Sequence, residues 1–156
     1  MILAAAFALA SATFAQGAPM PISTVYTRCS GANVSPELHW HGSPAATKSF
    51  ALVMHDPDAR APGGWYHWVA YNLPARTTEL AAGATLSQHQ LGRTSFGENA
   101  YGGPCPPPGK PHHYNFTLYA LNEPAVSGQY LTGPQLEHLI ARHTIATAKL
   151  MGLYGR

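Results

Sequence analysis

The sequence is poor in charge. Lys, Arg, Asp and Glu together make up only 10% of its 156 residues, and nine basic against seven acidic side chains leave a formal net charge of +2. No basic run accompanies this small surplus, so a nucleic-acid-binding protein is not expected. The length fits one ordinary domain with a single hydrophobic core.

Long hydrophobic runs are also absent. The apolar stretch 1–10 (MILAAAFALA) is too short to span a bilayer, so no transmembrane segment is expected. It is typical of the apolar part of a secretory leader, with cleavage near Ala6 or Ala15, although no positive residues precede it. Alternatively, a first strand over 7–11 has Phe7 and Leu9 facing inward. Both interpretations hold if a leader ends near Ala6. We therefore predict a leader remnant over 1–6, one domain over 7–156, and a periplasmic or secreted protein, with the cytoplasm as the alternative.

Cysteine is scarce, because the chain has only Cys29 and Cys105, which lie 76 residues apart. Neither belongs to a C-x-x-C pair, so a zinc knuckle or a redox motif is not expected. In an exported chain a single disulfide is the natural interpretation, and closing so long a loop stabilises by roughly 3–4 kcal/mol. Two unrelated buried thiols are the alternative.

Proline and glycine are plentiful, with 14 and 15 residues, and they predict many turns and few long helices. Apolar or alternating runs predict strands over 49–55, 65–71 and 114–121, which favour antiparallel sheets. Strict alternation places His67 on one strand face, together with Val69 and Tyr71. In the run 114–121, one face carries Tyr114, Phe116, Leu118 and Ala120.

Only the end of the chain predicts a helix. Pro134 suits a first helical position, and Thr132 with Gln135 fits a capping box. Apolar residues follow at helical spacing from Leu136, and Gly152 marks the expected end. The sequence therefore predicts a mainly β protein, an antiparallel β-sandwich with a C-terminal α-helix.

Three clusters carry side chains with chemical potential. Asp56 and Asp58 straddle a proline at a strand end, His67 lies among aromatic residues, and a rigid Pro/Gly-rich loop over 102–111 leads to His112 and Tyr114. Each has a structural alternative: an ordinary Asp-Pro turn, a packed core histidine, and a Pro-rich turn. Asp56, Asp58, His67 and His112 could also form a metal-binding or hydrolytic site. Against that alternative, the chain has neither a local H-x-x-x-H pair nor a G-x-S-x-G elbow.

These clusters together resemble the phosphatidylethanolamine-binding protein family, also called Raf-kinase-inhibitor-like proteins. The resemblance covers nearly the whole chain and depends on segments that occur in the family's order and spacing. They are Tyr26-Thr27, 33–40, 47–52, Asp56-Pro57-Asp58-Ala59, His67-Trp68, 101–107 and His112-His113-Tyr114.

The resemblance implies two antiparallel sheets with the C-terminal helix beside an anion pocket. It implies a protein that binds a phosphate-like anion or a phospholipid head group without enzymatic chemistry and without a cofactor, and that can also inhibit a kinase or a protease partner. Exported bacterial members carry cysteines at both positions, which supports a Cys29–Cys105 disulfide. The implied ligand-binding residues are Asp56, Asp58, His67, Cys105, Pro106, His112 and Tyr114.

Two residues depart from the family pattern. Arg60 stands where the family usually has proline, and it either adds a positive charge to the pocket or points outward. His113 replaces a common arginine, which puts the ion pair of that arginine in doubt. We expect His67, His112, Tyr114 and a backbone N–H to donate to the anion, Asp56 to orient one imidazole, and binding to strengthen towards pH 6. The natural ligand is not determined by these residues.

Overall fold

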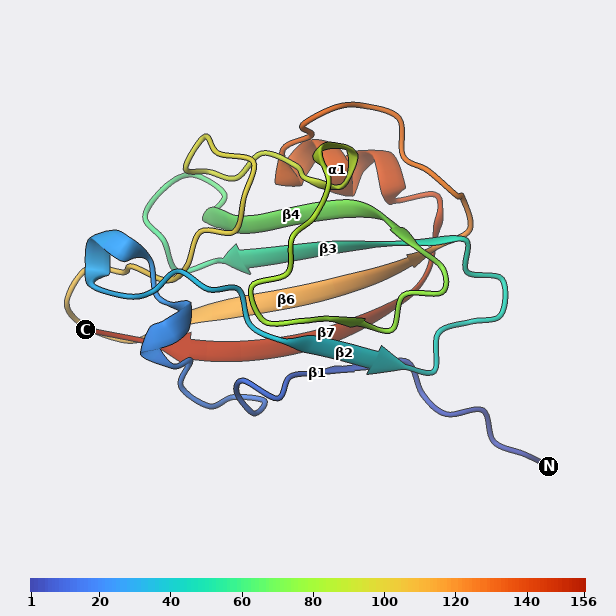
Figure 1. The fold of residues 1–156 in the computed structure, drawn as a ribbon, viewed down its shortest axis with the longest axis horizontal. Helices are drawn as coiled ribbons and strands as arrows, with labels where there is room; N and C mark the ends of the chain where they lie inside the picture. The colour runs from blue at the N-terminus through green and yellow to red at the C-terminus, as the bar shows by residue number, and fades with distance from the viewer.

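The computed structural model describes all 156 residues as two antiparallel sheets packed face to face (Figure 1). The smaller sheet has the order β1-β2-β5 and contains β1 (Ala8–Ala10), β2 (Leu38–His41) and β5 (Glu79–Leu80). The larger has the order β4-β3-β6-β7 and contains β3 (Ser49–Asp56), β4 (Trp65–Pro74), β6 (His112–Leu121) and β7 (Thr144–Tyr154). Three short 3-10 helices, η1 (Ile22–Thr24), η2 (Thr27–Cys29) and η3 (Gln88–Gln90), lie in the connections. The predicted mainly β class is confirmed.

The main hydrophobic core fills the space between the two sheets. Alternation along β6 brings Tyr114, Phe116 and Leu118 to its inner face, where all three are fully buried. Phe50 and Trp40, from β3 and β2, meet edge to face in the same core with ring centroids 5.4 Å apart. The predicted inner face of the strand over 114–121 is therefore confirmed.

The helix α1 (Gly133–Ile140) begins as predicted. The side chain of Thr132 accepts from the backbone N–H of Gln135, and the capping box is complete. Leu136 and Ile140 pack on the outer face of the larger sheet, against Val69 and others of a second apolar cluster. The helix therefore covers β3 and β4 from outside (Figure 1).

The prediction that this helix continues to Gly152 is wrong. Residues 144–154 form β7, which pairs with β6 over almost its entire length. Without β7, the long strand β6 would expose an unpaired edge. The apolar residues of 144–154 fit both periods over so short a stretch, and pairing with β6 decides for the strand.

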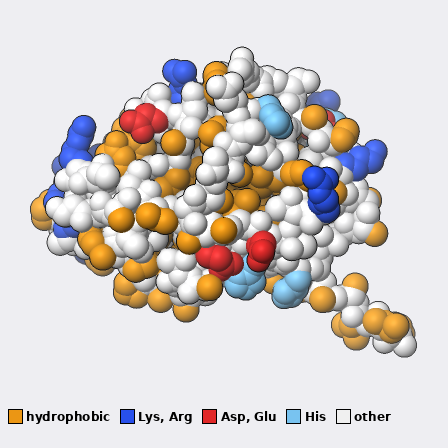
Figure 2. Space-filling view, viewed as in Figure 1, with side chains coloured by type: hydrophobic (Ala, Val, Ile, Leu, Met, Phe, Trp, Pro, Cys, Tyr) orange, Lys and Arg blue, Asp and Glu red, His pale blue; other side chains and the backbone are white.

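The N-terminal region contains the short strand that the sequence allowed. Leu9 in β1 is buried between the sheets, whereas Phe7 is only partly buried. Residues 1–6 are exposed and project from the domain as a mainly apolar tail (Figure 2). Their origin as a leader remnant stays a prediction. No helix of the structure has the length and apolarity that crossing a membrane requires.

Antiparallel pairing brings the ends of three neighbouring strands together at one end of the larger sheet. Asp56 ends β3, Trp65 begins β4 beside it, and His112 begins β6 on the other side. This end of the sheet lies at the left in Figure 1, where the loop over 101–111 also passes. The predicted disulfide is present, since Cys29 and Cys105 are bonded with their Cα atoms 5.5 Å apart. It ties η2 to that loop.

Candidate functional site

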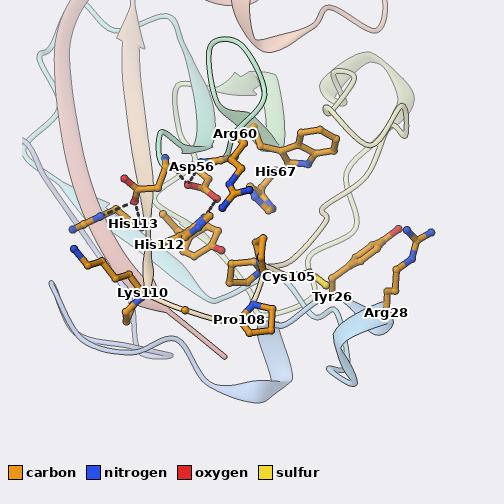
Figure 3. A pocket seen from close by; sticks show the side chains of 18 of the residues that line it. Tyr26, Arg28, Asp56, Arg60, His67, Cys105, Pro108, Lys110, His112 and His113 are labelled. Atoms are coloured by element: carbon orange, nitrogen blue, oxygen red, sulfur yellow. Dashed lines mark hydrogen bonds and ion pairs between the residues drawn. The ribbon is translucent and has the colours of Figure 1, made fainter.

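A cavity of about 750 Å³ opens at this end of the larger sheet (Figure 3). The structure brings the three sequence clusters together around it, although they lie far apart along the chain. All seven predicted ligand-binding residues line it: Asp56, Asp58, His67, Cys105, Pro106, His112 and Tyr114. The helix α1 contributes no lining residue, so the expectation that it lies beside the pocket is wrong. It packs on the opposite face of the sheet.

A β-bulge directs His67 into the cavity. Met54 pairs with Trp68 and His55 pairs with Tyr66, so His67 is the extra residue on β4. The bulge interrupts the alternation that the sequence predicted, because His67 now shares the inner face with Trp68 rather than the outer face with Val69. His67 is 3% exposed, and its ring meets the Tyr114 ring edge-on with centroids 5.1 Å apart.

Asp56 anchors the floor of the cavity. Its side chain is buried, and its Oδ1 accepts the backbone N–H groups of Asp58 at 2.8 Å and Ala59 at 3.2 Å. Its Oδ2 accepts the Nδ1–H of His112 at 2.7 Å. Both carboxylate oxygens are therefore engaged by the protein, and the His112 ring is held with its Nδ1 facing Asp56. This is the orienting contact that the sequence predicted for Asp56 and one imidazole.

His67 is fixed by a reciprocal pair of bonds with Gly102. The Gly102 N–H donates to the His67 carbonyl at 2.9 Å, and the His67 Nδ1–H donates to the Gly102 carbonyl at 2.7 Å. Burial is the main influence on this imidazole and lowers its pKa to about 4, against the opposing pull of the Gly102 carbonyl and Asp56. His67 is therefore neutral at physiological pH.

This geometry corrects the expected donor set. In a neutral histidine only one ring nitrogen carries a hydrogen. His67 and His112 both direct Nδ1 at an acceptor, so in their neutral forms each Nε2 has a lone pair and no hydrogen. The Tyr114 hydroxyl, by contrast, is buried without a hydrogen-bond partner and stays free to donate. Burial, with smaller effects from Asp56 and Asp58, raises the pKa of Tyr114 far above its ordinary value.

The mouth of the cavity carries both signs of charge. Arg60 lines it, and Figure 3 draws this side chain beside Asp56 and His67, which resolves its orientation in favour of the pocket. Arg28 and Lys110 lie on opposite sides of the opening (Figure 3). These cations offset the two carboxylates of Asp56 and Asp58.

His113, which stands where the family commonly has arginine, forms a hydrogen-bonded pair with Asp58. Its ring Nδ1 and its backbone N–H both lie 2.7 Å from Oδ2 of Asp58. The backbone and side-chain hydrogen bonds from His113 are the largest causes that lower the pKa of Asp58. Both side chains are exposed, so the pair orients the cavity mouth more than it stabilises the fold.

Sequence reasoning missed an aromatic wall. Phe96 stacks on Tyr26 with ring centroids 4.5 Å apart and meets Trp65 edge-on at 5.4 Å, and all three line the cavity. Tyr26 and Trp65 stood within recognised segments, but Phe96 lies in the weakly periodic stretch 75–110. No local signal in that stretch identifies Phe96.

The loop that closes the cavity depends on a glycine. A Cβ on Gly103 would collide with the backbone around Thr24 and Val25, so only glycine allows the loop to approach η1 so closely. Asn33 holds the loop in place, since its side chain accepts the Gly103 N–H at 2.7 Å and donates to the Tyr101 carbonyl at 3.3 Å. The wall that contains Cys105 and Pro106 is thereby fixed before any ligand arrives.

The fold and the cavity define a two-sheet antiparallel sandwich with a polar pocket at the ends of three strands. A sequence model of the family described as phosphatidylethanolamine-binding protein matches residues 10–155. The chain therefore belongs to the phosphatidylethanolamine-binding protein family.

Relatives agree with this assignment. The chain is 38% identical over 162 residues to UPF0098 protein YbcL of Escherichia coli, which covers 97% of this chain and 88% of that protein. It is 43% identical over 150 residues to a UPF0098 protein of Chlamydia pneumoniae, which covers 94% of this chain and 97% of that protein. The crystal structure of E. coli YbcL, described as a new member of the mammalian PEBP family, superposes with a TM-score of 0.91 at 36% identity and covers 97% of this chain and 99% of that one.

Proposed function

We propose that this chain binds a small phosphate-like anion, either free or as a phospholipid head group, in the cavity at the sheet edge, and that it performs no chemistry of its own. The observation that carries the proposal is the orphaned hydroxyl of Tyr114, buried in the same cavity as the fixed imidazoles of His67 and His112. A buried polar group without a partner costs about 1–3 kcal/mol, which a bound oxyanion would recover.

Charge at the opening supports an anionic guest. Arg28, Arg60 and Lys110 surround the mouth, and the backbone N–H of Cys105 has no hydrogen-bond partner within the protein. A bound oxyanion can accept from such groups, and charge-assisted hydrogen bonds of this kind are stronger than neutral ones.

The arrangement disfavours the metal-binding or hydrolytic alternative. A metal at this site would need free carboxylate oxygens, but both oxygens of Asp56 accept from protein donors and Oδ2 of Asp58 accepts from His113. No group of three or more His, Cys, Asp or Glu side chains has an arrangement that could hold a metal ion.

Export to the periplasm or beyond fits the disulfide, because such bonds persist in oxidising compartments.

Titration with inorganic phosphate, followed by NMR, tests the proposal. We expect weak binding, with chemical-shift changes at Cys105 and Tyr114, and at least about tenfold weaker binding in His112→Ala, since a hydrogen bond to a charged group contributes about 1.5–3 kcal/mol. His138→Ala, an exposed histidine of α1, is the matched control and should bind as the unmodified protein does. Equal affinity in His112→Ala would mean that phosphate binds elsewhere.

A further inference from the structure

Each of the two imidazoles in the cavity donates its Nδ1–H to an acceptor within the protein. The acceptors are a carbonyl oxygen, Gly102 O, for His67 and a carboxylate oxygen, Asp56 Oδ2, for His112. Neither acceptor can donate in return, so each Nδ1 carries the ring hydrogen of the neutral form. Neither Nε2 has a hydrogen-bond partner in the protein. The neutral cavity therefore offers two nitrogen lone pairs to a ligand.

The remaining groups do not change this balance. Asp56 already accepts from three protein donors, and its buried carboxylate keeps at most one further lone pair, on Oδ2 beside His112. The unpartnered donors are the Tyr114 hydroxyl, the Cys105 N–H and, at the mouth, the guanidinium of Arg60. The titratable and charged groups around the two imidazoles come from β3, the β3–β4 loop and β6: His55, Asp56, Asp58, Arg60, His113 and Tyr114.

An anion with acceptors only is a poor match for such a cavity. A phosphodiester or sulfate can accept from Tyr114 and Cys105, but its other oxygens would face the Nε2 lone pairs of His67 and His112. A hydrogen bond from either ring to such an oxygen requires that the imidazole first take up a proton, and the burial of His67 opposes that charge. A singly charged phosphomonoester has both kinds of group, because one of its oxygens carries a hydrogen that an Nε2 can accept.

We propose that the cavity selects an anion that carries its own acidic O–H, a phosphomonoester in its singly charged form, over a phosphodiester of the same charge. This selection rests on the proposed function, since it presumes that anions bind at this site. It separates two sources of phosphate: free or monoester phosphate fits, whereas the phosphate of an intact phospholipid, a diester, lacks the hydrogen.

Methyl phosphate and dimethyl phosphate form a matched pair of probes. Near pH 6, close to the second pKa of a monoester, we expect methyl phosphate to bind at least about tenfold more tightly, since a site that pairs with an O–H rejects the analogue without it. Above that pKa its affinity should fall about tenfold per pH unit, because the dianion must regain a proton. Equal affinities, or methyl phosphate binding that tightens as pH rises, would overturn the selection.

Calorimetry on the unmodified protein gives a second readout that needs no variant. In buffers of different ionisation enthalpy at about pH 7.5, binding of methyl phosphate should take up about one proton per ligand, because the free monoester is mostly dianionic there. Zero proton uptake would contradict the proposal. If both probes fail to bind at every pH, the proposed function itself falls; if both bind equally, only the selection does.

A variant sharpens the assignment to one ring. His112→Gln replaces a nitrogen lone pair with an amide that can donate, so dimethyl phosphate should gain affinity relative to methyl phosphate. His138→Gln on α1 is the control and should leave the ratio of the two affinities unchanged. An unchanged ratio of the two affinities in a folded His112→Gln would show that His112 does not accept the O–H of the monoester.

Discussion

The two faces of the larger sheet carry similar polar side chains, but these differ in burial and in hydrogen-bond partners. On the inner face, Asp56, His67 and Tyr114 are buried around the cavity. On the outer face, a hollow of about 460 Å³ is lined by His55 and Glu137, and Glu137 accepts from the Tyr66 hydroxyl at 3.4 Å. Neighbours on one strand, His55 and Asp56, therefore serve opposite faces.

Partners and burial distinguish the two groups. In the outer hollow, His55 Nε2 lies 2.7 Å from the Gly63 carbonyl, and the side chains there remain partly open to water. Burial, as the largest cause, raises the pKa of Glu137, but water can still replace its weak bond to Tyr66. On the inner face the disulfide-tied loop encloses the polar groups. Residue type alone does not define a candidate site; the enclosing loops and the unmet hydrogen-bonding capacity do.

The largest difference between the faces should follow removal of the disulfide. Reduction, or the double change Cys29→Ser and Cys105→Ser, should lower the free energy of unfolding by about 4 kcal/mol, because the bond closes a loop of 76 residues. Urea denaturation measures this loss. NMR shifts should change around Cys105 and Tyr114 and stay constant around Lys149 in the outer hollow. Equal stability with and without the bond would contradict the prediction.

A smaller effect should separate the two carboxylates. Asp56→Ala should cost about 3 kcal/mol of stability, since it leaves two partly buried N–H groups and the ring of His112 without their acceptor. Glu137→Ala should cost less than about 1 kcal/mol, because its one hydrogen bond is long and partly exposed to water. Thermal or urea denaturation of both variants makes the comparison. A larger loss in Glu137→Ala would refute this contrast between the faces.

Local sequence signals predicted much of this architecture. The alternation over 114–121 identified the inner face of β6, and the Thr132–Gln135 capping box identified the start of α1. The Asp-Pro-Asp, His-Trp and Pro-rich segments each resemble a family pattern, and their joint occurrence predicts that Asp56 and His112 share one pocket. These features depend on neighbours in sequence or on family resemblance.

The remaining features depend on contacts between distant segments. The bulge at His67 arises from its pairing with β3, and strict alternation placed this residue on the wrong face. The strand β7 owes its form to the open edge of β6, although its composition also allowed a helix. Phe96 reaches the cavity only because its long connection folds across the mouth beside Tyr26. The states of the two imidazoles likewise follow from Gly102 and Asp56, which no local motif links to them.

The smallest predicted effect concerns acid. Because the folded state holds the pKa of His67 at about 4 and an unfolded histidine titrates near about 6.5, only the unfolded chain gains a proton as the pH falls between these values. Stability should therefore decrease by about 2 kcal/mol from about pH 6.5 to pH 5, and the loss should level off below about pH 4.

The variant His67→Asn isolates this contribution. Its amide can still donate to the Gly102 carbonyl but does not titrate, so the loss of stability in this range should disappear, apart from what other groups contribute. His138→Asn, which removes an exposed histidine of α1 that is not among the groups acting on His67, is the control and should lose stability as the unmodified protein does. Urea denaturation at several pH values measures all three proteins. If His67→Asn loses as much stability as the unmodified chain, His67 is not the group held neutral, and the contrast between the faces must come from another residue.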